Sequence, residues 1–114
     1  MFARATTFQS TPGAVDGGIR FLVRELAAAV EVLPGFLGMI DLVNRQTGQA
    51  VTVTFWETEE ARAASAEFAR QAAGKVAEEG AENVIAVNEY EVGVYTMTDG
   101  LSSRPLHKLP PPNA

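Results

Sequence analysis

The sequence predicts an α+β fold in which strands and helices follow one another in the order βαββαβ. Several short segments alternate polar and apolar residues, as strands do, and two longer segments repeat apolar residues every three or four positions, as amphipathic helices do. The order strand–helix–strand occurs twice along the 114 residues. This is the split βαβ, or ferredoxin-like, arrangement, in which four antiparallel strands form one sheet and two helices cover one face of it.

The first strand and the first helix are separated by a clear break. Residues 2–9 are rich in Thr and Phe, which favour strands, and Thr11-Pro12-Gly13 ends this segment. Apolar residues then recur at helical spacing between positions 19 and 33. We expect an amphipathic helix of about four turns, capped near Asp16 and ended before Pro34-Gly35.

The next two segments predict a β-hairpin. Residues 36–44 form the expected second strand, residues 45–48 a turn that ends in Gly, and residues 49–56 the third strand. The third strand alternates strictly, so its two faces differ. One face carries Val51, Val53 and Phe55, and the other carries Thr52, Thr54 and Trp56.

A second helix and a fourth strand complete the pattern. Thr58 is a suitable N-cap, and apolar residues follow at helical spacing over residues 61–76, with Gly80 ending the region. Residues 84–96 predict a long fourth strand. Residues 99–114 are rich in Pro and lack periodicity, so we expect a flexible tail there and a single domain over residues 1–98.

Apolar residues on both faces of two strands indicate a homodimer. The second strand has Ile40 and Leu42 on one face and Met39 and Val43 on the other, and the fourth strand is also apolar on both faces. The two helices can cover only one face of the sheet. We therefore expect the other face to pack against a second copy of the chain.

Composition excludes several classes of function. The net charge of −5, with no cluster of cations, disfavours a nucleic-acid partner. The chain has no Cys, and its single His, His107, lies in the Pro-rich segment, so a metal site or a Ser-His-Asp triad is not expected. No nucleotide-binding motif, secretory signal or membrane-spanning segment is recognisable. We expect a cytoplasmic protein without a cofactor.

Three segments carry a resemblance to a known family. They are Pro34-Gly35-Phe36-Leu37-Gly38, Phe55-Trp56-Glu57-Thr58-Glu59-Glu60-Ala61 and Asn88-Glu89-Tyr90-Glu91-Val92. In this order and spacing, residues 1–98 resemble the antibiotic-biosynthesis-monooxygenase-like family of dimeric α/β barrels. The resemblance implies a ligand cavity between the sheet and the helices. Members of that family include cofactor-independent monooxygenases acting on aromatic polyketides, quinol monooxygenases and haem-degrading enzymes.

The family's functional residues carry over only in part. The Trp of the polyketide-oxidising members matches Trp56, but their Asn falls on Thr52 and their Tyr on Arg62. The proximal His of the haem-degrading members falls at about Gly74, so haem degradation is not expected. The candidate ligand-binding residues are Trp56, Thr52, Arg62, Phe68 and Tyr90.

Several of these side chains also have a purely structural interpretation. Trp56 could stack on an aromatic ligand, but we favour the interpretation that it closes the core, and Phe68 also suits a core position. Asp41 lies on the same side of its strand as Met39. If buried, it would have a raised pKa and could act as a base. We favour instead an exposed carboxylate paired across the sheet or the dimer interface.

Two functions remain open from the sequence. The first is a small oxidoreductase, similar to the cofactor-independent monooxygenases, that holds an aromatic or quinol-type molecule beside Trp56. The second is a non-catalytic dimeric barrel that binds a small apolar ligand or serves as an accessory protein. An apolar pocket with two or more convergent polar groups favours the enzyme, whereas a filled interior favours the accessory role.

Overall fold

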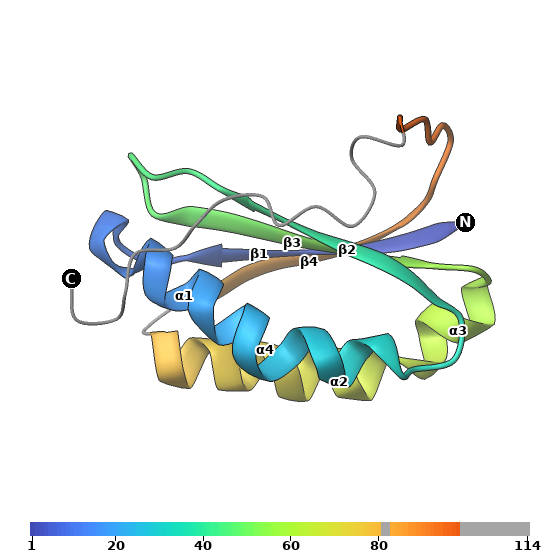
Figure 1. The fold of residues 1–114 in the computed structure, drawn as a ribbon, viewed down its shortest axis with the longest axis horizontal. Coiled ribbons are helices and arrows are strands. Elements are labelled where there is room, and N and C mark those ends of the chain that lie inside the picture. Colours follow the sequence, from blue (N-terminus) through green and yellow to red (C-terminus); the bar gives the residue numbers. More distant parts are fainter. Residues whose placement is uncertain (81–82, 99–114) are drawn as a thin grey trace.

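The computed structural model describes residues 1–80 and 83–98, and the expected tail 99–114 lies outside the described residues. The four strands form one antiparallel sheet in the order β2-β3-β1-β4, and the helices lie together against one face of it (Figure 1). This confirms the ferredoxin-like α+β fold. The elements are β1 (Phe2–Gln9), α1 (Val15–Phe21), α2 (Ala27–Glu31), β2 (Phe36–Val43), β3 (Gln49–Trp56), α3 (Glu59–Ala64), α4 (Ala66–Gly80) and β4 (Asn83–Glu91).

The first helical segment begins earlier than predicted and is not uniform. A 3₁₀ turn at Pro12–Ala14 leads into α1, and a π-helical turn at Leu22–Leu26 separates α1 from α2. The sequence predicted a helix cap near Asp16, but Asp16 lies within the first turn of α1. There its carboxylate forms an ion pair with Arg45 at 2.8 Å, which ties the helix to the β2–β3 turn.

The second predicted helix is two helices, α3 and α4, separated at Ser65. Its predicted cap is confirmed, because the Thr58 hydroxyl accepts a hydrogen bond from the Ala61 N–H at 3.0 Å. The Ser65 hydroxyl donates to the carbonyl oxygen of Arg62 at 2.6 Å. A serine hydroxyl competes with backbone N–H groups for such a carbonyl, and this favours a break in the helix.

The fourth strand is shorter than the predicted residues 84–96. Its partner strand β1 begins at Phe2, opposite Glu91, so little backbone remains for later residues to pair with. The last contact is a hydrogen bond from the Val92 N–H to the Met1 carbonyl oxygen at 2.9 Å. The chain then leaves the sheet, and Tyr95 packs edge-on against Phe55, with 6.0 Å between the ring centroids.

The two faces of the sheet have different surroundings. The registry of β1 and β3 directs even-numbered residues toward the helices, and the core there is built around Phe8, Phe21 and Val76. The opposite face has no helix among the described residues (Figure 1). We call it the open face. Its apolar side chains are Ile40, Leu42, Val51, Val53 and Phe55.

Gly35 permits the tight connection between α2 and β2. Its φ angle is +77°, a left-handed conformation that favours glycine. Its carbonyl oxygen accepts a hydrogen bond from the Glu57 N–H at 2.8 Å. A Cβ atom at this position would come within 2.5 Å of the Ala61 Cβ. Both the backbone and the space available therefore require glycine.

We expect Gly35→Ala to lower the free energy of unfolding by about 1–3 kcal/mol, because the new methyl group meets Ala61 and alanine rarely adopts this φ angle. Urea unfolding followed by circular dichroism measures the change. Gly74→Ala is the matched control, since Gly74 is exposed in α4 and has nothing within 4 Å of an added Cβ. The control should instead gain about 0.5–1 kcal/mol. Equal effects of the two substitutions would contradict the assigned role of Gly35.

Candidate functional site

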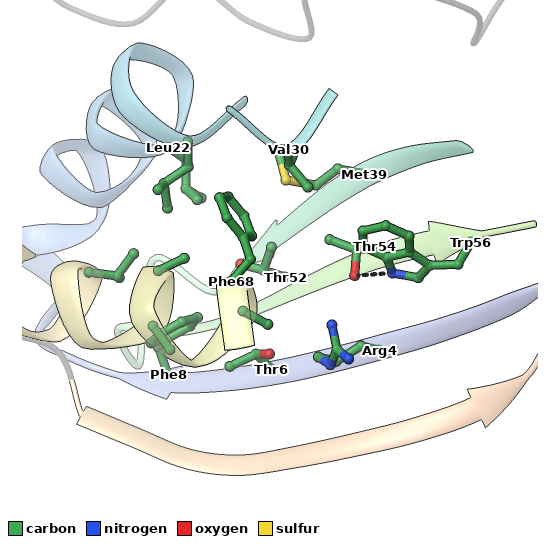
Figure 2. Close-up of a pocket in the computed structure, with 15 residues that line it drawn as sticks. Arg4, Thr6, Phe8, Leu22, Val30, Met39, Thr52, Thr54, Trp56 and Phe68 are labelled. Carbon is green, nitrogen blue, oxygen red and sulfur yellow. Dashed lines mark hydrogen bonds between the residues drawn. The ribbon is translucent and has the colours of Figure 1, made fainter. Parts of the chain in front are cut away.

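A pocket lies between the sheet and the helices (Figure 2). Its cavity volume is about 70 Å³, and most of its wall is apolar. Strands β1, β2 and β3 form one side, while the first helical segment and α4 form the other. The side chains that line it are Arg4, Thr6, Phe8, Leu22, Leu26, Val30, Met39, Thr52, Thr54, Trp56, Phe68, Ala69, Ala72, Ala73 and Val76.

The pocket exists because small side chains face each other across the layers. Helix α4 contributes Ala69, Ala72 and Ala73 to the wall, and the facing strands contribute threonines such as Thr6 and Thr52. An interior is normally packed without voids larger than a water molecule. Alanine opposite threonine leaves space that larger residues would fill, and the hydroxyl groups supply polar atoms inside it.

The π-helical turn Leu22–Leu26 lies directly over this space. Its first and last residues, Leu22 and Leu26, both line the pocket. Single π-helical turns within helices occur frequently at functional sites, since they shift side chains that a regular α-helix would place elsewhere. The position of this turn is therefore a second indication that the pocket is the functional site.

An outer groove adjoins the inner pocket and lies between the first helical segment and α4. Its volume is about 350 Å³, and it shares Leu26, Phe68 and Ala72 with the inner cavity. Glu25 and Lys75 are among the residues that line it. Figure 2 shows the Phe68 ring extending from α4 between the helices and the sheet. Displacement of this ring would join the two spaces.

Trp56 belongs both to the core and to the pocket wall. Its side chain is 1% exposed, and its ring packs edge-on against Phe36 with 5.5 Å between centroids. Its indole N–H donates to the Thr54 hydroxyl at 3.0 Å (Figure 2). The indole N–H is thus already used within the protein. Trp56 can offer a ligand its aromatic surface, and the hydroxyl of Thr54 keeps a hydrogen to donate.

Asp41 and Thr52 form a hydrogen-bonded pair across strands β2 and β3. The Thr52 hydroxyl donates to Asp41 Oδ1 at 3.0 Å, and Thr52 itself lines the pocket. Asp41 is paired across the sheet, as favoured by the sequence, but it is partly buried on the helix side and not exposed. Burial raises the pKa of the Asp41 carboxyl, and the hydrogen bond from Thr52 lowers it to a smaller extent. The pair can accept a proton from a ligand hydroxyl.

Arg4 is the charged residue of the pocket wall, and the sequence analysis did not identify it. Its side chain is only 4% exposed. It donates to the Ser65 hydroxyl at 2.9 Å and to the Arg62 carbonyl oxygen at 2.8 Å, and it forms an ion pair with Glu89 at 3.3 Å. Glu89 therefore lies on the helix side of the sheet, although 41% of its side chain remains exposed. The only sequence signal was that Arg4 shares a strand face with Thr6 and Phe8.

Three of the five predicted ligand-binding residues lie in the pocket wall, namely Trp56, Thr52 and Phe68. Arg62 lies outside that wall. Its guanidinium forms an ion pair with Glu89 at 2.9 Å and lies 5.4 Å from the centre of the Phe2 ring. Tyr90 pairs with Ala3 and so lies on the open face, 54% exposed.

Two groups of solved structures share this architecture. The monooxygenase ActVA-Orf6 of Streptomyces coelicolor, solved with nanaomycin D, is 12% identical, with a TM-score of 0.65 over 85% of this chain and 91% of its own. A Deinococcus radiodurans protein assigned as an antibiotic biosynthesis monooxygenase is 17% identical, with a TM-score of 0.62 over 86% of this chain and 98% of its own. The fold is that of the antibiotic biosynthesis monooxygenases.

The heme-degrader MhuD of Mycobacterium tuberculosis has the same monooxygenase-like fold. It is 26% identical, with a TM-score of 0.58 over 85% of this chain and 100% of its own, and its structure holds two hemes in the active site. Haem does not fit the pocket described above. The pocket wall offers no imidazole, thiolate or phenolate to bind iron, and the cavity is only about 70 Å³. Gly74, at the expected histidine position, is exposed in α4.

The curated proteins that match part of this chain include uncharacterized proteins of Mycobacterium tuberculosis. The uncharacterized protein Rv2558 of Mycobacterium tuberculosis is 37% identical over 67 residues, which is 59% of this chain and 28% of the relative. The uncharacterized protein Rv2557 of the same organism is 36% identical over 67 residues, or 30% of its length. This chain thus spans less than a third of either relative in the match. No protein-family model matches it.

The described part of the chain shows neither a metal-ligand cluster nor a membrane-spanning helix. Within residues 1–80 and 83–98, no three potential metal-ligating side chains of His, Cys, Asp or Glu come together. No helix in the same residues is long and apolar enough to cross a membrane.

We expect the Asp41 carboxyl to titrate above its ordinary pKa of 3.8. Between the unfolded and folded pKa values the folded state binds more protons, so the free energy of unfolding falls as pH rises through this window and stays lower above it. Asp41→Asn removes this penalty and should raise the free energy of unfolding at neutral pH. Carbon-detected NMR of the carboxyl group measures the pKa, and urea unfolding measures the stability.

Thr52→Val should raise the pKa of Asp41 further, because it removes the hydrogen bond that favours the charged carboxylate. Thr7→Val makes the same chemical change on the open face and should leave that pKa unchanged. Titration of Asp41 at or below 3.8 in the unmodified protein would show that its carboxylate is well solvated.

Proposed function

We propose that this chain is a small cofactor-independent monooxygenase that acts on an aromatic or quinol-type molecule held between the sheet and the helices. The observation that carries the proposal is an apolar pocket into which hydroxyl groups converge beside a buried tryptophan. Convergent polar groups in an apolar cavity are the usual form of a small-molecule site. The ligand-bound neighbour ActVA-Orf6, which holds nanaomycin D, supports the choice of an aromatic substrate.

The size of the site agrees with a ligand that reaches both spaces. Pockets for drug-sized ligands have volumes of about 300–1,000 Å³. The inner cavity of about 70 Å³ is below that range, whereas the outer groove of about 350 Å³ is within it. The reacting ring would lie in the inner cavity, with Phe68 displaced and the rest of the molecule extending into the groove.

The chemistry begins with loss of a proton. The substrate hydroxyl donates its proton to Thr52 Oγ1, and the Thr52 proton passes to Asp41 Oδ1, 3.0 Å away. The resulting aromatic anion transfers one electron to O₂, and the substrate radical and superoxide combine to form a C–O bond. The peroxide adduct takes the proton back from Asp41 to give a hydroperoxide on a ring carbon that still carries a hydrogen. Its C–H and O–O bonds then break, water leaves, and a carbonyl remains on the ring.

The residues proposed here for proton transfer differ from those of the polyketide-oxidising members of the family. The Asn and Tyr of the polyketide-oxidising members correspond here to Thr52 and Arg62, and Arg62 is not in the pocket wall. The Asp41–Thr52 pair takes over proton transfer in the proposal. The apolar wall excludes water and so strengthens the electrostatic effect of each polar group.

A titration that records Trp56 fluorescence and O₂ uptake together tests the proposal. Trp56 is the single Trp of the chain, so the fluorescence reports on this site. We expect saturable quenching by hydroxyanthrones or quinols, with O₂ uptake above the rate in buffer. Asp41→Asn and Thr52→Val should each lower the rate of O₂ uptake by about 10²-fold while quenching persists, because they remove the proton acceptor.

Thr7→Val is the matched control and should keep the full rate, since Thr7 lies on the open face. Saturable quenching without O₂ uptake would reject the monooxygenase and favour the second function, a non-catalytic barrel that binds a small apolar ligand or serves as an accessory protein. The absence of quenching with every aromatic compound tested would reject the ligand site itself.

We also propose that the chain forms a homodimer through the open face. The open face is apolar across β2 and β3, and Leu42 there is 55% exposed. Contiguous exposed apolar surface of this kind marks interfaces, and a self-complementary face gives a symmetric dimer. The domain over residues 1–98, the tail over 99–114 and a cytoplasmic location also remain predictions from the sequence.

Val53→Lys should convert the dimer into a monomer, because it places a charge in the middle of the open face. Light scattering after gel filtration should give a mass near 12.2 kDa for the variant and twice that for the unmodified chain. Val32→Lys is the control, since Val32 is 81% exposed after α2 and away from the sheet. A monomeric unmodified chain at micromolar concentration would reject the dimer.

A further inference from the structure

The guanidinium of Arg4 lies at the Trp56 end of an apolar pocket (Figure 2). Arg4 and Thr54 are directly opposite on β1 and β3, and Trp56 follows two residues later on the same face. The Arg4 side chain is 4% exposed, so water reaches little of it. A charged group so deeply buried must find its partners within the protein or in a ligand.

The protein uses four of the five N–H groups of Arg4. The Nε–H and one hydrogen of Nη2 donate to Glu89 Oε1, at 3.4 and 3.3 Å, and the other Nη2 hydrogen donates to the Arg62 carbonyl oxygen at 2.8 Å. One hydrogen of Nη1 donates to the Ser65 hydroxyl at 2.9 Å. A guanidinium has five N–H groups. One Nη1 hydrogen is left without an acceptor among residues 1–80 and 83–98.

The charge of Arg4 is also incompletely balanced. Glu89 Oε1 lies 3.3 Å from Arg4, and Glu89 Oε2 lies 2.9 Å from Arg62, so one carboxylate is shared by two guanidinium groups with a net charge of +1. The Glu59 carboxylate reaches Arg62 at 3.7 Å, but it is 66% exposed and screened by water. The pocket wall itself contains no acidic side chain.

We propose that the Trp56 end of the pocket binds an oxygen anion of an aromatic ligand, a carboxylate or a phenolate, through Arg4. The remaining Nη1 hydrogen donates to the anion, and the ligand's ring lies against the apolar wall beside Trp56. The ligand charge compensates the excess charge of the Arg4–Glu89–Arg62 cluster. This inference rests on the proposed aromatic-ligand site and specifies which aromatic molecules that site selects.

Matched ligand pairs that differ in charge test the inference without any turnover. Isothermal titration calorimetry would compare cinnamate with cinnamamide, and para-nitrophenolate with para-nitroanisole. We expect the unmodified protein to bind at least one anion about tenfold more tightly than its neutral counterpart, the effect of one hydrogen bond to a charged group. The two pairs distinguish a carboxylate site from a phenolate site.

Substitutions then separate anion binding from a purely structural role of Arg4. Arg4→Met should abolish the preference for the anion, and Arg4→Lys should retain part of it. Glu89→Gln should increase the preference, because it removes the carboxylate that competes for Arg4. A merely structural Arg4 predicts no such increase. Arg70→Met, which removes an exposed guanidinium from α4, should leave the preference unchanged.

The possible outcomes separate the role of Arg4 from the existence of the aromatic site. If Arg4→Met fails to fold, Glu89→Gln and Arg4→Lys still test the direction of the effect. Equal affinity for the anion and its neutral counterpart in both pairs would overturn the role of Arg4 and leave the aromatic site intact. No binding of any of the four compounds would overturn the aromatic site together with this inference. An unchanged preference for the anion in Arg4→Met would also overturn the role of Arg4.

Discussion

Burial of the Arg4 guanidinium links three parts of the fold that are distant in the sequence. From β1 it contacts the Ser65 hydroxyl at the α3–α4 junction, the Arg62 carbonyl oxygen and the Glu89 carboxylate on β4. Removing such a charge from water costs several kcal/mol unless its partners are well placed. The break between α3 and α4 supplies two of these partners. The helix break, the position of β4 and one end of the pocket therefore depend on the same contacts.

Much of the fold followed from local pattern. The bounds of β1 and β3, the Thr58 cap and the turn at Gly35 are as the residue types predict, because each depends on neighbours a few positions away. The secondary-structure predictions that were wrong depend on contacts between residues distant in the sequence. The break at Ser65 accompanies its contact with Arg4, and the early end of β4 reflects where its partner strand begins. The π-helical turn has no signal in hydrophobic spacing, which α-helices and π-helical turns share over so few residues.

The candidate site was predictable only where one strand or one helix determines it. Thr52 and Trp56 share a face by alternation, so either both or neither could line a pocket. Arg4 resembles an ordinary exposed arginine until β1 is paired with β4 and covered by the helices. The side that Tyr90 occupies depends on the pairing of β4 with β1, whose registry shifts between Thr7 and Phe8. Such a shift is invisible in the sequence of β4 alone.

Methionine methyl resonances test most directly whether ligands occupy the pocket between the sheet and the helices. Of the three methionines, Met39 lines the pocket, whereas Met1 and Met97 are exposed outside it. A hydroxyanthrone added without oxygen to ¹³C-methyl-labelled protein should shift the Met39 resonance in a saturable manner and leave those of Met1 and Met97 in place. A saturable shift at Met97 with Met39 unchanged would contradict this account, because it would locate the ligand outside the space between the sheet and the helices.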